Sequence, residues 1–413
     1  MEQLFNINLN KIPISSKKEE INRKKNLELF LDGGFPNRKD ENWKFTDLNL
    51  IIKKNFKKIN NNFDFSFQRK IDLINEFDHN NIIMVNGLYQ SSDLKFEEKE
   101  KVKIESLKSL DESISQSSNN LYCLNKALSI GGFYLEIKDN YKCKRPIVIY
   151  NYFTSNLDNK IINNSNKIKL NQNSELNLIE YNINEKSKFI KNTFEIVEIN
   201  DNSILKSISI QKTKSDGYFY KNISGTQGYN SGYHNFILSS GLKFNKIDLE
   251  MNLKRENSNC FVLSGLSLGK DEHQELKTKV NHLAPNCKSY QKIKNVLESD
   301  SKGVYQGKIF VKDIAQKTDA YQLSKALILD NQAEFNAKPE LEIYADDVKC
   351  SHGSSSGSID EDSIHYIMTR GIEFDVAKKL LIKGFLNEIF ENIVEKKIKL
   401  FLEKSIEEQI NGV

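Results

Sequence analysis

A cysteine and a histidine lie two positions apart, at Cys350 and His352, near the end of the stretch 338–357. If the chain is extended there, both side chains point to the same side, because alternate residues of a strand share a face. A thiolate and a neutral imidazole suit iron or zinc. Two ligands do not close a tetrahedral site, so distant residues or another chain must complete it. The alternative is a buried cysteine and a solvent-facing histidine without a shared role.

The residues before this pair predict two short strands joined by a corner. Apolar residues up to Ala345 share one parity, whereas Cys350 and His352 share the other. A straight strand does not switch faces, so Asp346 and Asp347 mark the corner. Because adjacent residues of a strand face opposite ways, these two aspartates are expected to form a turn and not an acid/base pair.

Motifs for common catalytic sites are absent from the sequence. It contains no GxxxxGK[ST] phosphate loop, no GxSxG nucleophile elbow and no HExxH zinc motif. The remaining histidines are scattered over expected strands, loops and helices and are interpreted as surface or hydrogen-bonded core residues. They are His79, His234, His273, His282 and His365.

Composition excludes several classes of protein. Sixty basic and 56 acidic residues in 413 leave a net charge of +4, which argues against nucleic-acid binding through a concentrated basic patch. No apolar run is long enough to span a bilayer, and the first 20 residues lack the apolar core of a signal peptide, so a cytoplasmic protein is expected. The five cysteines are widely spaced without a CxxC pair, which disfavours a disulfide framework or a self-contained zinc site.

The hydrophobic periodicity divides the chain into three regions. Residues 1–130 form a mixed, partly helical region, residues 131–357 a long series of strands, and residues 358–413 a helical end. The strands alternate apolar and polar residues, are punctuated by Asn, Gly, Asp and Ser, and admit a helical interruption only around 321–335. This excludes a βαβ fold and favours a mainly β protein with a coiled parallel β-helix, with a sandwich or barrel as the rival.

The first region carries a helix start signal and the only tryptophan. Ser16 and Glu19 form a capping box, and Gly33 and the glycine after it end the helix. Trp43 is expected to pin its polar loop onto the protein body, with a binding anchor as the alternative. The segment 97–129 is expected to be helical and loop-like.

The last region predicts two or three amphipathic helices. A second capping box is expected at 358–361. A helical stripe of residues is the candidate surface for a partner, although packing on its own chain explains such a stripe equally well. Its members are Phe374, Ala377, Leu381, Gly384 and Phe385. Glycine inside a helix costs about 1 kcal/mol relative to alanine, so Gly384 hints at a close approach.

Several motifs resemble the SufB/SufD family of iron–sulfur cluster assembly proteins. The longest is KPELEIYADDVKCSHG at 338–353, followed by SIDEDSIHYIMTRGI at 358–372 and AKKLLIKGF at 377–385. GFPNRKDENWKFTDL at 34–48 is similar to an N-terminal motif of the family, with Phe in place of Leu and of Tyr. The full DVKCSHG string and the lack of an N-terminal cysteine cluster resemble the SufD branch.

The resemblance implies a right-handed parallel β-helix flanked by helical regions. It further implies a non-enzymatic scaffold that pairs with a SufB-like subunit and docks a SufC-like ABC ATPase on its C-terminal helices, with no nucleic acid or membrane involved. His352, with Cys350 nearby, is then expected to help build a transient nascent cluster shared with the partner. The resemblance leaves open whether the chain binds a flavin and whether it forms a homodimer in isolation. No flavin motif is present. The alternatives are a stand-alone β-helix enzyme acting on polysaccharide and a metal-free structural protein.

Overall fold

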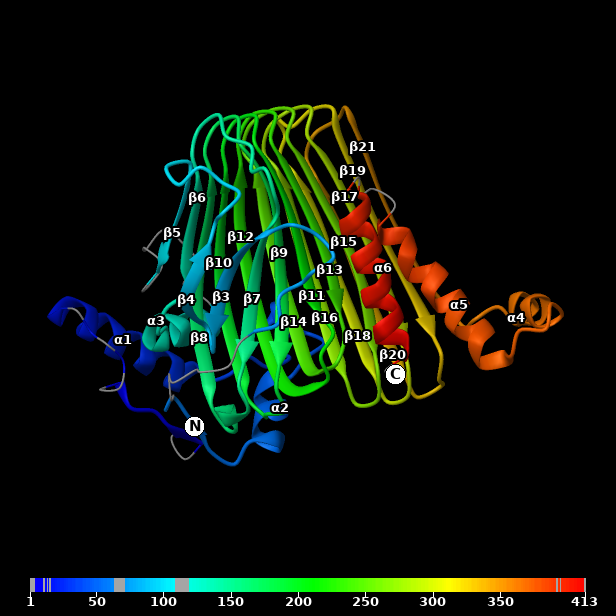
Figure 1. Cartoon of the computed structure of the whole chain (residues 1–413), viewed down its shortest axis with the longest axis horizontal. Helices are drawn as coiled ribbons and strands as arrows, with labels where there is room; N and C mark the ends of the chain where they lie inside the picture. Colours follow the sequence, from blue (N-terminus) through cyan, green and yellow to red (C-terminus); the bar gives the residue numbers. More distant parts are fainter. Residues whose placement is uncertain are drawn as a thin grey trace.

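The chain forms a β-solenoid with helices at both ends (Figure 1). The computed structural model describes residues 4–9, 12, 14, 16–62, 71–107, 119–390, 393 and 395–411. About eight turns of the solenoid each contribute one strand to a nine-stranded sheet and one to a ten-stranded sheet. The expected mainly β, coiled architecture is therefore confirmed, and the rival sandwich and barrel are wrong.

Successive strands alternate between the two sheets. The nine-stranded sheet contains β20 (Glu334–Ile343), β18 (Lys302–Val311), β16 (His273–His282), β14 (Leu242–Leu253), β12 (Ser215–Gln227), β10 (Ile190–Ile199), β8 (Ile161–Leu170), β6 (Phe133–Ile137) and β5 (Val102–Ser106). The ten-stranded sheet contains β21 (Val348–Gly357), β19 (Thr318–Ile328), β17 (Lys288–Leu297), β15 (Asn259–Leu268), β13 (Gly232–Ser239), β11 (Ile204–Gln211), β9 (Glu175–Asn184), β7 (Ile147–Phe153), β3 (Asn80–Val85) and β4 (Leu88–Asp93). All pairs are parallel except β3–β4 and β5–β6.

An asparagine in the left-handed conformation forms one corner of most turns. Asparagine adopts this conformation more readily than other residues with a side chain, because its short amide can bond locally. The series is Asn140, Asn173, Asn202, Asn230, Asn257 and Asn286. Their amides stack along the axis, with Asn173 donating to Asn140 at 2.8 Å and Asn230 to Asn202 at 3.0 Å. Lys317 takes the next corner, and the corner before Cys350 has no left-handed residue.

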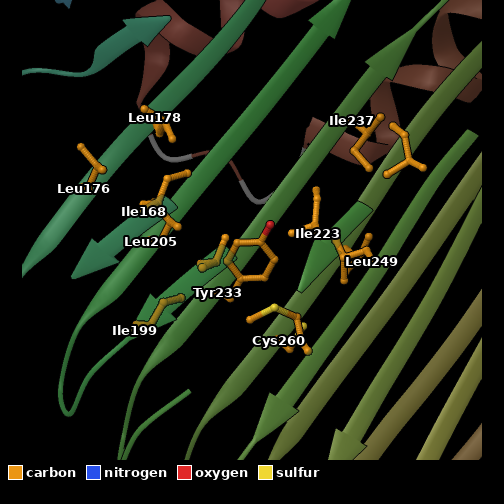
Figure 2. Close-up of a cluster of buried hydrophobic side chains, with 14 of the residues drawn as sticks. Ile168, Leu176, Leu178, Ile199, Leu205, Ile223, Tyr233, Ile237, Leu249 and Cys260 are labelled. Atoms are coloured by element: carbon orange, nitrogen blue, oxygen red, sulfur yellow. The ribbon is translucent and has the colours of Figure 1, made fainter. Parts of the chain in front are cut away.

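The space between the sheets is the main hydrophobic core (Figure 2). Ile168 of the nine-stranded sheet and Leu176 and Leu178 of the ten-stranded sheet point into it. Alternate residues of each strand face this interior, so the period-two pattern of the sequence translates directly into burial. The two sheets end with β20 and β21 beyond the last turn, and with β5 and β4 at the opposite end.

The N-terminal elements cover the outer face of the nine-stranded sheet. They are β1 (Phe5–Asn6), α1 (Lys17–Gly33), the 3-10 turn η2 (Glu41–Trp43), α2 (Leu48–Asn55), β2 (Ile59–Asn60) and α3 (Asn120–Leu128); a second 3-10 turn, η3 (Ser155–Leu157), follows β7. Ser16 caps α1 by accepting from the Glu19 amide at 3.1 Å, as expected. Trp43 is buried, with its ring 5.5 Å from that of Tyr220, so the packing interpretation is confirmed.

Helices α4 (Glu361–Met368), α5 (Phe374–Asn387) and α6 (Lys396–Asn411), with the 3-10 turn η4 (Glu388–Phe390), follow the solenoid. Figure 1 shows α6 lying along the ten-stranded sheet, whereas α4 and the start of α5 project beyond β21. Buried residues of α6, including Leu402 and Ile406, pack with outer-face residues such as Ile179 and Ile208. We call residues 358–390 the arm.

Three local predictions are wrong. The region 321–335 is not helical, because β19 is hydrogen-bonded between β17 and β21. Within 97–129, Asn120–Leu128 is helical as expected, but Val102–Ser106 is a strand paired with β6, and residues 108–118 lie outside the described part. The cap of α4 is Asp360, which accepts from the Ser363 amide, and not a box at 358–361. A Cβ at Gly384 would meet nothing within 4 Å in the described chain, so the close approach suggested for this glycine is not made within the chain and stays a prediction.

The division of the chain into three regions, with boundaries after residues 130 and 357, stays a prediction. Strands β3, β4 and β5 come from the segment before residue 131 and extend both sheets. No helix in the described part of the chain is long and apolar enough to cross a bilayer.

Because His282 is buried, we expect the folded state to lose stability in acid. Burial lowers the pKa of its ring to about 4, and Nε2 lies 2.9 Å from Ser289 Oγ. The unfolded chain protonates this histidine near pH 6.5, so between about pH 6.5 and 4 only the unfolded state gains the proton, and stability falls as the pH drops.

We expect this single group to contribute a slope of up to about 1.4 kcal/mol per pH unit to the free energy of unfolding. Urea unfolding of wild type and His282→Gln at pH 7 and pH 5 measures it. The variant should lose less stability over this interval than the wild type, and equal losses would contradict the prediction.

Candidate functional site

Strands β20 and β21 are the edge strands of the two sheets at the C-terminal end of the solenoid. Each is hydrogen-bonded to a neighbouring coil on one side only within the described residues, to β18 and β19 respectively. An unpaired edge exposes a row of backbone donors and acceptors that can bind another strand. The pair Cys350 and His352 lies on β21, at this open end.

Cys350 points toward the interior of the last turn. It is in register with buried Ala320 and packs against the small apolar cluster that contains Ile309 and Ala345. The residue is only half-buried because no further coil covers it. Burial, assisted by the Asp319 carboxylate, raises the pKa of the thiol, so it is protonated at neutral pH in the isolated chain. Metal binding would have to displace that proton.

His352 lies on the same face as Cys350 but is exposed. Its register partner is Gln322 of β19, which is fully buried. Gln322 Nε2 donates to the Glu340 carbonyl of β20 at 3.3 Å and so joins the two sheets beneath the histidine. The imidazole of His352 therefore lies over buried Gln322 and is exposed to solvent, where it can bind a group from outside the chain.

The described residues do not complete a metal site by themselves. Among the described residues, no three His, Cys, Asp or Glu side chains gather closely enough to hold a metal ion. The prediction that Cys350 and His352 project to one side is confirmed by the register, and Asp346 and Asp347 lie in the corner between β20 and β21. The donor set, one thiol and one imidazole, fits iron but needs ligands from elsewhere.

The predicted partner stripe on α5 divides between two faces of the helix. Ala377 is fully buried, and Leu381 and Phe385 are partly buried, so these three face the chain itself. Phe374 and Gly384 are exposed. Packing on the same chain was the alternative reading of this stripe, and it holds for three of the five residues.

Exposed apolar residues follow a different line along the arm. Val376, Leu380 and Gly384 are spaced four apart and all exposed, with Val376 and Leu380 at 49% and 46%. On α4, Tyr366 is 61% exposed with the Arg370 guanidinium 3.7 Å from its ring centre, and Met368, 40% exposed, lines the groove between the arm and the solenoid. The sequence could have revealed the line from Val376 to Gly384, because positions i, i+4 and i+8 share a helix face. The more apolar stripe through Ala377 was predicted instead.

A groove separates the arm from the last turns of the solenoid. Its volume is about 590 Å³. It is lined by apolar residues, together with Glu361, Asp362, His365 and Lys378. The apolar lining is Ile328, Leu329, Ile359, Ile364, Met368 and Phe374. The start of the arm is therefore held away from the body.

Fold and site together define a β-solenoid whose last turn is open, carries an incomplete metal-ligand pair and is followed by a projecting helical arm. The model of the SufBD core domain, described as SUF system FeS cluster assembly, matches residues 152–385, and that of the SufBD N-terminal region matches residues 2–149. The chain belongs to the SufB/SufD family of iron–sulfur cluster assembly proteins.

Curated relatives agree with this assignment. The iron-sulfur cluster assembly protein SufD of Escherichia coli is 27% identical over 383 residues, covering 90% of this chain and 89% of the relative. Protein ABCI7, chloroplastic, of Arabidopsis thaliana is 25% identical over 410 residues, covering 94% and 85%. A SufBD family protein of Synechocystis is 29% identical over 214 residues, covering 51% and 46%. The chain is therefore a SufD homologue.

Proposed function

We propose that this chain is the non-ATPase scaffold subunit of a cytoplasmic iron–sulfur assembly complex, in which a SufB-like subunit pairs with its open end. The observation that carries the proposal is the incomplete pair Cys350 and His352 on a strand whose outer edge is unpaired. A second solenoid that adds its own end strands would supply both backbone partners and missing ligands. Family membership favours this role over a polysaccharide enzyme or a metal-free structural protein.

In this proposal the cluster is cargo, and this chain contributes ligands to it. His352 binds iron through a ring nitrogen, since its imidazole is exposed and needs no proton removed when neutral. Cys350 serves as an auxiliary thiol whose raised pKa keeps it protonated until iron or a partner charge favours the thiolate. A flavin is not needed for these roles.

The arm docks a SufC-like ABC ATPase in this proposal. Its exposed apolar line on α5, formed by Val376, Leu380 and Gly384, is left uncovered by the described part of the chain. Soluble proteins seldom leave such a surface exposed unless a partner covers it. Displacement of the arm by the ATPase would then act on the nearby end of the solenoid.

The test is co-expression of the chain with SufB-like and SufC-like partners, purification of the assembly, and analysis of iron and acid-labile sulfide. A stable hetero-complex that accumulates both elements when supplied with iron and a sulfur donor is expected. A chain that forms only a homo-oligomer, or a complex that acquires no iron under these conditions, would refute the proposal.

A further inference from the structure

The arm is held to the solenoid at one end of α5. Ile382, Leu386 and the η4 residue Ile389 are buried against the ten-stranded sheet, whereas Phe374, Val376 and Leu380 in the first half of α5 are exposed. The approach is close, because a Cβ placed on Gly265 of β15 would lie 2.8 Å from Ile389 Cδ1. Gly265 thus allows the end of the helix to rest directly on the strand.

Lys294 of β17 fastens this end of the helix. Only 1% of its side chain is exposed. Nζ donates to the Phe385 carbonyl at 2.6 Å, forms an ion pair with Glu388 at 2.5 Å, and lies 4.3 Å from the centre of the Phe385 ring. Lys292, two residues earlier, also pairs with Glu388, at 3.2 Å. The carbonyls in the last turn of a helix lack partners within the helix, so Lys294 satisfies a group that needs a donor.

A buried ammonium fixes position more strictly than apolar contacts do. Leucine and isoleucine side chains can slide by a fraction of a residue at little cost, whereas a desolvated charge must keep its acceptors within hydrogen-bonding distance. Burial lowers the pKa of Lys294, and the pairing with Glu388 opposes this shift. Lys294 therefore sets where α5 lies on the sheet.

The strand that carries Lys294 is joined through β19 to β21, the strand of the candidate site; the register counterpart of Lys294 there lies three residues beyond His352 and on the opposite face of the sheet. Lys294 is in register with Lys325 of β19, which is in register with Ser355 of β21. β17 is therefore two strands from the strand of Cys350 and His352, a distance of about 10 Å. Continuous parallel hydrogen bonding links the three strands.

We propose that Lys294 is a positioning residue that transmits displacement of the arm to the terminal turn of the solenoid. The inference rests on the proposed docking of an ATPase on the arm. It separates two properties of the arm: the exposed face of α5 provides affinity for the partner, and the Lys294 contact converts movement of the helix into a change at β21.

The experiment compares wild type with Lys294→Met, Lys294→Arg and Lys383→Met. Methionine keeps most of the volume of lysine but cannot donate, and arginine keeps the charge and the cation–π contact. Lys383 is the matched control, because it lies on α5 and pairs with Glu407 of α6 on the surface. Each chain is assayed in the complex with both partners for ATPase binding and for ATP-dependent cluster assembly, and alone for hydrogen exchange of α5.

In Lys294→Met, we expect unchanged ATPase affinity, faster exchange at 374–387, and ATP-dependent assembly reduced at least about fivefold, the lower range of typical coupling between sites. Lys294→Arg should restore most of the rate, and Lys383→Met should match wild type. Assembly by Lys294→Met at the wild-type rate overturns the inference, as does a loss that follows loss of ATPase binding. If the wild-type complex itself makes no cluster, the proposed function fails instead.

Discussion

Replacement of His352 by alanine is expected to reduce cluster formation on the assembled complex by more than about 100-fold, beyond the 10–100-fold typical of residues that only support a ligand. The imidazole is the one exposed nitrogen ligand on β21, and neighbouring side chains are hydroxyls or glycine. Because His352 is exposed on an edge strand, its removal should leave the fold intact. Cluster formation is measured as the iron and sulfide content after reconstitution. The midpoint of thermal unfolding checks that the fold is intact.

Three further variants serve as comparisons for His352→Ala. Ser351→Ala changes the opposite face of the same strand and should be silent. His365→Ala removes an exposed histidine from α4 and should also be silent for cluster binding. Cys350→Ser removes the thiol and reports its share of the binding. Normal cluster formation by His352→Ala, with full complex assembly, would assign the ligand role to other residues.

Substitution of Leu380 by aspartate is expected to weaken binding of the ATPase subunit by at least about 30-fold, or about 2 kcal/mol, the threshold of an interface hot spot. Leu380 is 46% exposed at the centre of the line from Val376 to Gly384. Docking would bury an uncompensated carboxylate there, which is more costly than losing the leucine alone. Calorimetry or surface plasmon resonance with the purified ATPase gives the ratio of dissociation constants.

Two further variants make this test specific. Leu29→Asp changes an equally exposed leucine of α1, far from the arm, and should bind normally. Gly384→Leu places a bulky side chain where nothing lies within 4 Å in the isolated chain, so its own fold should tolerate it while a closely docked helix would not. Wild-type affinity in both Leu380→Asp and Gly384→Leu would exclude this face as the docking surface.

Most of the fold could be predicted from the sequence, since the solenoid obeys local rules. Strand residues such as Leu176 and Leu178 alternate with polar residues, and the interior simply collects one parity. The corners also left a signal, because asparagine recurs where a left-handed residue is required, as at Asn202 and Asn230. The prediction around 321–335 failed because its alanines and leucines fit a helix locally, and only hydrogen bonding to β17 and β21 settles the conformation.

The two candidate ligands of the site could be predicted from the sequence, but the residues that surround them could not. The spacing of Cys350 and His352 fixed their common face, whereas the position of Gln322 beneath His352 depends on which strands become neighbours. The arm shows the same limit. The strongest apolar stripe, through Ala377, turned out to face the chain, because apolar periodicity does not say whether a helix face meets its own chain or another.

If the C-terminal end of the solenoid pairs with a second subunit as proposed, the unpaired edges of β20 and β21 tie the amount of this protein in the cell to the amount of that subunit. A surplus copy carries β20 and β21 uncovered, and uncovered edges recruit other strands, including those of identical copies. Degradation or self-pairing is then the fate of molecules that find no partner. Balanced synthesis of the two chains is therefore a requirement set by backbone hydrogen bonding at the last turn, independent of any cluster chemistry.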